Sequence, residues 1–126
     1  MPADSRGALG KLGEDLACDE LGRRGYIILE RRYRTRFGEL DIIARDGGVL
    51  VFVEVRTRSS RRFGTPFESV TWQKRHRISR MAASYLSARG LANVRCRFDV
   101  AAVTPDASGA LQVDIVRAAF DVSCGR

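Results

Sequence analysis

Two apolar runs, at residues 40–44 and 49–57, flank a short glycine-containing segment in the middle of the chain. The segment Asp46-Gly47-Gly48 is typical of a two-residue hairpin turn, because glycine adopts the positive φ angles that such turns need. The sequence therefore predicts two adjacent antiparallel strands. The second run reads as a strand buried on both faces, yet it contains the acidic residue Glu54.

The turn also predicts how the two strands pair. A connection at Gly47-Gly48 places Asp46 opposite Val49, so that Asp41 lies opposite Glu54. Directly opposed side chains on one face of an antiparallel pair have Cβ atoms roughly 4.5–5.5 Å apart. The register therefore predicts that two carboxylates are neighbours on the sheet.

The same register places Glu39 opposite Arg56. Because side chains alternate along a strand, we expect these two residues on the same face as the two acids. We expect the other face to carry Leu40 and Ile42 against Val55 and Val53.

Two opposed carboxylates repel each other and lose solvation under a covering helix, so they need a compensating positive charge. Arg56 is one candidate for this charge. A divalent cation is another, since Mg²⁺ accepts one or two carboxylates together with phosphate oxygens and waters. The alternative is a structural network of Asp41, Glu54 and Arg56 that holds no ligand, and a register slip of one residue would separate the acids.

Hydrophobic periodicity predicts the other elements. Apolar residues recur at helical spacing over 9–24 and 71–89, whereas 26–29, 96–102 and 111–115 are typical of strands, the last two joined by a turn at 105–109. We interpret 30–36 as a basic connector and 58–68 as a long basic loop. The order α-β-β-β-α-β-β predicts an α/β fold with a mixed sheet of about five strands flanked by helices.

The length of 126 residues predicts a single domain, with a core at about 8–118 and a frayed C-terminal tail. No apolar run approaches the roughly 20 residues of a membrane span, and the start lacks the apolar region of a secretory signal, so we expect a cytoplasmic protein with no membrane partner. The three cysteines show no ligand spacing, which argues against a disulfide framework or a zinc site.

The net charge of +7 favours a polyanionic partner, with nucleic acid first and an anionic membrane surface second. A solvated basic surface without a partner is the alternative. Lys74 falls on the core-facing side of the second helix, where it either approaches the acids or extends along apolar surface, and the single His76 falls on the outer side as a surface residue. The residues that we expect to bind nucleic acid are Arg34, Arg36, Arg58, Arg61, Arg62, Gln73 and Lys74.

Several short motifs together resemble the YraN-like family of small bacterial proteins. They are Gly13-Glu14, Gly25-Tyr26, Gly38-Glu39-Leu40-Asp41-Ile42-Ile43-Ala44, Val51-Phe52-Val53-Glu54-Val55-Arg56, Lys74 and Arg97-Phe98-Asp99-Val100. The likeness covers the chain from Gly10 to about Val103. That family looks like a member of the restriction-endonuclease-like PD-(D/E)XK nucleases and is similar in layout to archaeal Holliday junction resolvases.

The resemblance implies a metal-dependent endonuclease, a hydrolase that acts on DNA phosphodiesters, including branched or junction DNA. Asp41 and Glu54 would hold Mg²⁺ or Mn²⁺, with the Val55 carbonyl and Glu14 as further ligands and with Lys74 beside them. Cutting both strands of a symmetric junction would require a homodimer, for which the sequence shows no interface.

One position departs from the pattern, because Arg56 stands where the E-x-K motif of the superfamily has lysine. Arginine is always charged, bulkier and forked, whereas lysine places a compact ammonium with a tunable pKa. Arg56 would then neutralise the phosphate while Lys74 shares the role of the lysine. The alternative function is a non-catalytic nucleic-acid-binding or assembly module that retains the nuclease fold, and a third is a purely structural partner protein.

Overall fold

The computed structural model describes residues 5–58, 71–91 and 93–119. Its elements are α1 (Ser5–Arg23), β1 (Ile27–Thr35), β2 (Gly38–Asp46), β3 (Val49–Thr57), α2 (Trp72–Ala88), β4 (Arg95–Pro105) and β5 (Leu111–Val116). The order confirms the predicted α/β arrangement. Most of the predicted basic loop, including Arg61 and Arg62, and the end of the C-terminal tail lie outside the described residues.

The five strands form one mixed sheet in the order β1-β2-β3-β4-β5. Neighbouring strands are antiparallel except for β3 and β4, which are parallel and lie on either side of α2 in the sequence. A parallel pair needs such a long connection, since a short turn cannot return the chain to the same end of the sheet.

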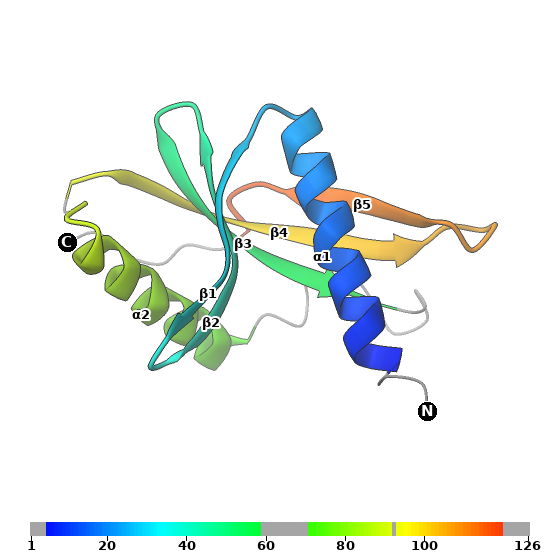
Figure 1. Ribbon diagram of the computed structural model, residues 1–126, viewed down its shortest axis with the longest axis horizontal. Coiled ribbons are helices and arrows are strands. Elements are labelled where there is room, and N and C mark those ends of the chain that lie inside the picture. Colours follow the sequence, from blue (N-terminus) through cyan, green and yellow to red (C-terminus); the bar gives the residue numbers. More distant parts are fainter. Residues whose placement is uncertain (1–4, 59–70, 92, 120–126) are drawn as a thin grey trace.

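The two helices cover opposite faces of the sheet, and each face has its own core (Figure 1). The face under α1 packs Ile42, Ala44, Val51 and Val53 against the helix. The face under α2 packs a second set of residues, among them Leu40, Ile43, Leu50, Phe52, Ile78 and Met81. Because the central strands are buried on both faces, their sequences are continuously apolar where helices cover them.

The ends of the helices follow local signals in the sequence. After α1, Gly25 has a φ of +90°, and the Tyr26 N–H donates to the Leu21 carbonyl, which ends the helix as the glycine predicts. At the start of α2, the Thr71 hydroxyl accepts a hydrogen bond of 3.2 Å from the Lys74 N–H. This N-cap holds the first turn of α2, and with it Lys74, in a defined position.

The interpretation of residues 30–36 as a connector is wrong, because residues 30–35 belong to β1 and only Arg36 lies in the turn that follows. The strand is an edge of the sheet, where exposed arginines are tolerated and discourage pairing with another chain. Tyr33 is the inward-facing residue of this segment, and its ring meets that of Tyr85 edge to face with centroids 5.0 Å apart. Because arginines are frequent in this segment, it lacks the apolar pattern that predicts a strand.

The predicted hairpin register is confirmed where the two strands pair. Pairs run from Asp46 with Val49 to Ile42 with Val53, and Gly47 has a φ of +62°. The pairing stops there, so neither the predicted opposition of Asp41 and Glu54 nor that of Glu39 and Arg56 is part of the ladder. Leu40 also departs from the prediction, because it packs on the α2 face whereas Ile42 packs on the α1 face.

The reason is that β2 pairs with β3 only from Ile42 onward, while its first residues, 38–41, form a ribbon with β1 that extends toward α2 (Figure 1). We call the point where β2 leaves β3 the fork. The ribbon reaches the helix through the Tyr33 contact and through an ion pair between Glu30 and Arg89.

The motif around Asp99 is structural. This fully buried carboxylate accepts hydrogen bonds from the Tyr26 hydroxyl (2.7 Å), the Arg97 guanidinium (2.9 and 3.0 Å) and the Ala118 N–H (2.9 Å). Burial, followed by the hydrogen bond to Asp99, raises the pKa of Tyr26 to about 12. The network ties β4 to the turn after α1 and to the chain that follows β5.

The approach of α1 to β3 requires glycine at position 13. A Cβ atom built on Gly13 would lie 2.1 Å from the Thr57 Oγ1 atom, whereas one built on Gly22 in the same helix would meet nothing within 4 Å. We expect Gly13→Ala to lower the free energy of unfolding by about 1–3 kcal/mol through overpacking. Gly22→Ala is the matched control and should stabilise the helix by up to ~1 kcal/mol.

Urea unfolding of the two variants checks this prediction. Thr57→Ala, combined with Gly13→Ala, should recover part of the loss because it removes the clashing hydroxyl. Equal stability of the Gly13 and Gly22 variants would contradict the close packing of α1 on β3.

Candidate functional site

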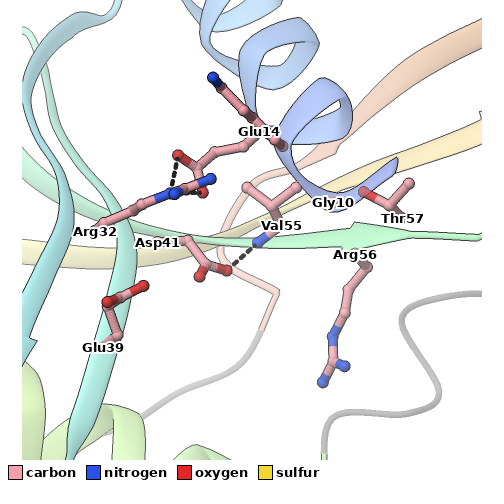
Figure 2. Close-up of a pocket in the computed structure, with 9 residues that line it drawn as sticks. Gly10, Glu14, Arg32, Glu39, Asp41, Val55, Arg56 and Thr57 are labelled. Carbon is pink, nitrogen blue, oxygen red and sulfur yellow. Dashed lines mark hydrogen bonds and ion pairs between the residues drawn. The ribbon is translucent and has the colours of Figure 1, made fainter. Parts of the chain in front are cut away.

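The fork leaves backbone groups of β3 without a ladder partner on the β2 side, and Asp41 takes over that role. Its Oδ2 atom accepts a hydrogen bond of 2.8 Å from the Val55 N–H (Figure 2). In an antiparallel strand, the N–H and C=O of one residue point toward the same neighbour, so we expect the Val55 carbonyl to face the fork as well. A carboxylate and a carbonyl therefore meet at the point where the sheet opens.

Asp41 and Glu54 form an acid pair at the fork. Burial, followed by the nearby negative charge of Glu54, raises the pKa of Asp41 to about 7, while the hydrogen bond from Val55 acts in the opposite direction. The pair thus lies one step beyond the last paired residues, where the predicted register places it.

Two positive groups lie close to the acid pair. Burial, followed by the charge of Arg56, lowers the pKa of the Lys74 ammonium, whereas Glu54 and Asp41 favour its charged form. Lys74 therefore lies within electrostatic reach of both acids from the first turn of α2, rather than only extending along apolar surface. In Figure 2 the Arg56 side chain extends from β3 away from α1.

A cavity of about 410 Å³ opens beside the acid pair. Its walls come from α1, β1, β2 and β3, and its lining residues are Gly10, Lys11, Glu14, Arg32, Glu39, Asp41, Val55, Arg56 and Thr57 (Figure 2). The cavity is open and polar, and acidic and basic side chains face each other across it. Such a surface suits a charged substrate better than an apolar ligand.

Glu14 reaches this cavity from α1, but arginines engage its carboxylate. The side chain is buried, with 7% of the residue exposed, and its Oε1 atom accepts from Arg31 at 2.9 Å and from Arg32 at 3.1 Å. The charge of Glu14 still contributes to the raised pKa of Asp41. In this arrangement Glu14 is an ion-pair partner of two arginines at the cavity wall.

Arg32 holds an unusual backbone conformation, with a φ of +53° inside strand β1. A residue with a side chain rarely adopts this left-handed region, which costs on the order of 1 kcal/mol or more. Arg32 lies on the ribbon opposite Asp41, between the paired residues Arg31 and Tyr33. The strained backbone directs the guanidinium to Glu14 on the cavity wall.

The acid pair and the Val55 carbonyl offer hard oxygen donors, which fit Mg²⁺ or Mn²⁺. Within the described ranges, no three His, Cys, Asp or Glu side chains gather in a way that could hold a metal. This finding is compatible with a magnesium site, since Mg²⁺ commonly takes only one or two carboxylates and completes its shell with water and phosphate oxygens. The crowding of negative charge on Asp41 and Glu54 is what such a cation would relieve.

The predicted nucleic-acid-binding residues fall into two groups. Arg34 and Arg36 lie on and beside the β1–β2 turn; Arg34 pairs with Glu39 at 3.3 Å, and the Arg36 guanidinium lies 4.9 Å from the centre of the Phe37 ring. Gln73 is exposed in the first turn of α2, next to Lys74, and Arg58 follows β3. These side chains therefore come from three separate segments, the β1–β2 turn, the end of β3 and the start of α2, and among them Lys74 interacts with the acid pair.

Sequence reasoning missed the contacts made by Arg31, Arg32 and Gly13. A connector gives the two arginines no defined partner, whereas their position on β1 brings them to Glu14. The signal for Gly13 was available, since a glycine inside a helix costs stability and usually has a packing reason. Nothing in the arginine-rich sequence of residues 30–36 predicts the positive φ of Arg32.

Comparison with known proteins identifies the family. A model of the Uncharacterised protein family UPF0102 matches residues 13–103. The chain belongs to this family. The match spans the fork, α2 and most of β4, and it confirms the YraN-like resemblance at the level of the family.

Relatives from diverse bacteria align along nearly the whole chain. The UPF0102 protein of Moorella thermoacetica is 52% identical over 112 residues, which are 88% of this chain and 93% of that relative. A UPF0102 protein of Symbiobacterium thermophilum is 48% identical over 89% of this chain and 95% of its own, and one of Geobacter sulfurreducens is 44% identical over 91% and 90%. The names of these relatives state only the family.

The described helices include none that is long and apolar enough to cross a membrane.

The raised pKa of Asp41 predicts how stability depends on pH. Because the pKa is higher in the folded protein than its usual 3.8, the metal-free fold is favoured by protonated Asp41 at low pH and loses this contribution as the pH rises through about 7. Asp41→Asn keeps an acceptor for the Val55 N–H but removes the charge. We expect the gain in stability of this variant over wild type to be greater at pH 8 than at pH 5, by on the order of 2 kcal/mol.

Thermal and urea unfolding in EDTA at the two pH values measure this difference. Asp114→Asn, on the exposed side of β5, is the matched control and should show no such dependence. A pH-independent effect of Asp41→Asn would contradict the electrostatic coupling of the acid pair.

Proposed function

We propose that this protein is a divalent-metal-dependent nuclease that hydrolyses DNA phosphodiesters, with a restriction-endonuclease-like fold. The observation that carries the proposal is the acid pair at the fork, where Asp41 and Glu54 crowd negative charge beside Lys74. Titratable groups with strongly shifted pKa values, gathered beside a polar cavity, are characteristic of catalytic sites. The net charge of +7 and the arginines around the fork support a polyanionic substrate.

A contrast within the same chain supports a functional reading of the pair. Asp99 is more deeply buried than Asp41, yet its charge is met by Arg97 and by other donors. Asp41 instead faces a second carboxylate. Repulsion between the two acids lowers the stability of the fold, so stability does not explain why both are present. A role in binding a cation or a phosphate group at the fork does explain it.

In this proposal Asp41, Glu54 and the Val55 carbonyl would hold Mg²⁺ or Mn²⁺. When bound, the cation would lower the pKa of a coordinated water and stabilise the charge on the leaving oxygen. The Val55 N–H keeps the Asp41 carboxylate in one orientation. Lys74, whose ammonium has a lowered pKa, would orient the phosphate and exchange a proton at Nζ, while Arg56 would neutralise phosphate charge.

The second candidate is a non-catalytic nucleic-acid-binding or assembly module. Arg56 in the place of the motif lysine favours it, as does the engagement of Glu14 by Arg31 and Arg32. In that case binding to DNA depends on salt but not on the acid pair, so that EDTA and Glu54→Gln leave it unchanged.

A cleavage assay on single-stranded, duplex and four-way-junction DNA with Mg²⁺ or Mn²⁺ tests the proposal. We expect cleavage of at least one of these substrates, and we expect Asp41→Ala and Glu54→Gln to lower its rate by about 100-fold or more, as loss of a metal ligand does. Asp114→Asn should leave the rate unchanged. Absence of cleavage on every substrate, or cleavage that survives Asp41→Ala, would refute the nuclease proposal.

The division of roles between Lys74 and Arg56 gives a further prediction. Lys74→Gln should lower the cleavage rate by about 100-fold, in the range of a lost general acid or base, which is more than the loss of one phosphate contact should lower DNA affinity. Adding Arg56→Lys in this background should recover part of the rate, because Arg56 lies close enough to influence Lys74 and a lysine supplies a titratable ammonium there.

Single-turnover rates and fluorescence anisotropy separate the two effects. Arg45→Gln, an exposed cation on β2 at the end remote from the fork, is the control for general loss of charge. A Lys74→Gln variant that retains the full rate would remove Lys74 from the chemistry.

A further inference from the structure

The start of α2 displays an aromatic side chain to solvent. Trp72 is 72% exposed, more than any other large hydrophobic residue in the described part of the chain. Its indole stacks on the His76 imidazole, with ring centres 5.1 Å apart and planes within 9° of parallel. We call these two stacked rings the platform. A large apolar ring kept in water at a defined orientation is typical of an interaction site.

The charge on α2 shows what kind of partner would fit. The helix contains no Asp or Glu, while cations occupy positions 74, 75, 77 and 80. Positive side chains in the first turns are unfavourable to the helix itself, because the N-terminus already carries the positive end of the helix dipole. Helix stability therefore does not explain these four cations, whereas binding of an anionic partner would explain them.

The basic surface continues from the platform toward the β1–β2 turn. The Arg80 guanidinium lies 5.6 Å from the centre of the Phe37 ring, which Arg36 also approaches. A groove of about 570 Å³ runs between that turn and α2, and its lining residues are Arg36, Phe37, Arg80, Ala83, Ser84, Ser87 and Ala88. Cations and aromatic rings alternate along this path, as they do where proteins follow a single nucleic-acid strand.

The other side of α2 excludes a membrane as the partner. An amphipathic helix binds a bilayer by inserting its apolar face. In α2 that face is occupied, because Ile78, Met81, Ala82, Tyr85 and Leu86 are buried in the core against the sheet. The outer side carries the platform, the basic side chains and small or polar residues such as Gln73, Ala83 and Ser87.

We propose that the platform stacks on an unpaired base of single-stranded DNA while the cations of α2 hold the flanking phosphates. A base within a duplex is already stacked on its neighbours, so the platform selects unpaired strands. Trp72 and Lys74 both belong to the first turn of α2, so the platform lies near the residue that faces the acid pair, although the two side chains point to different sides of the helix. This assignment of a substrate class rests on the proposed nuclease function.

Trp72 is the single tryptophan of the chain, so its fluorescence reports on the platform alone. In EDTA, titration with an oligothymidine strand should quench this fluorescence, and a duplex of equal length should quench it much less. Equal quenching by both DNAs, or none by the single strand, would overturn the proposal. So would a blue shift on anionic lipid vesicles without quenching by the oligonucleotide.

Binding of a labelled strand, followed by anisotropy, tests the contribution of the ring. Trp72→Ala should weaken binding of the single strand by about 10-fold or more and leave duplex binding unchanged, whereas Trp72→Phe should retain most of the affinity. Ile27→Ala, another exposed apolar residue, is the control for a general loss of surface. An equal loss for single strand and duplex in Trp72→Ala would contradict base stacking.

These measurements separate the platform from the nuclease proposal. Quenching by the single strand without cleavage under any metal would refute the nuclease and support the platform as a binding site. Cleavage that requires Asp41, together with unchanged binding in Trp72→Ala, would support the nuclease and overturn the platform.

Discussion

The hydrogen bond from the Val55 N–H to the Asp41 carboxylate makes the fork possible. A strand that leaves its partner exposes backbone groups, and a buried N–H without an acceptor is costly. Asp41 supplies the acceptor, so β2 is able to part from β3 and carry the ribbon toward α2. The ring contact between Tyr33 and Tyr85, the cavity beside the fork and the approach of Lys74 all depend on this separation.

Two acids of the sheet, the buried Asp99 and the partly buried Asp41, illustrate how environment assigns a role. Asp99 is surrounded by donors that satisfy its charge, and it locks β4 to the neighbouring segments. Asp41 receives one backbone donor and faces Glu54, so its pKa rises toward neutrality. The charge of Asp99 is satisfied within the protein, whereas Asp41 and Glu54 together leave negative charge that a cation would neutralise. Sequence alone does not distinguish them, because both acids occur within apolar strands.

The parts of the fold that were predictable depend on local chemistry. The glycines at 47 and 48 set the turn, and the turn set the register that makes Asp41 and Glu54 neighbours. The remaining features depend on distant contacts. The edge position of β1 permits its arginines, the end of the β2–β3 ladder turns Leu40 to the other face, and the positive φ of Arg32 brings a guanidinium to Glu14. No short sequence motif predicts any of these three features.

The mixed sheet has a consequence for the order in which the chain assembles. The β1–β2 and β2–β3 pairs close over short turns, whereas the parallel pairing of Val49 with Arg95 must wait for the intervening chain to fold back across α2. Closing short loops costs less entropy and is faster, so the meander of β1, β2 and β3 is expected to form first. The acid pair comes from this early unit. The repulsion between Asp41 and Glu54 is therefore present before α2 docks. When α2 docks, it brings the Lys74 ammonium close to the two acids, so the last step of folding reduces this repulsion.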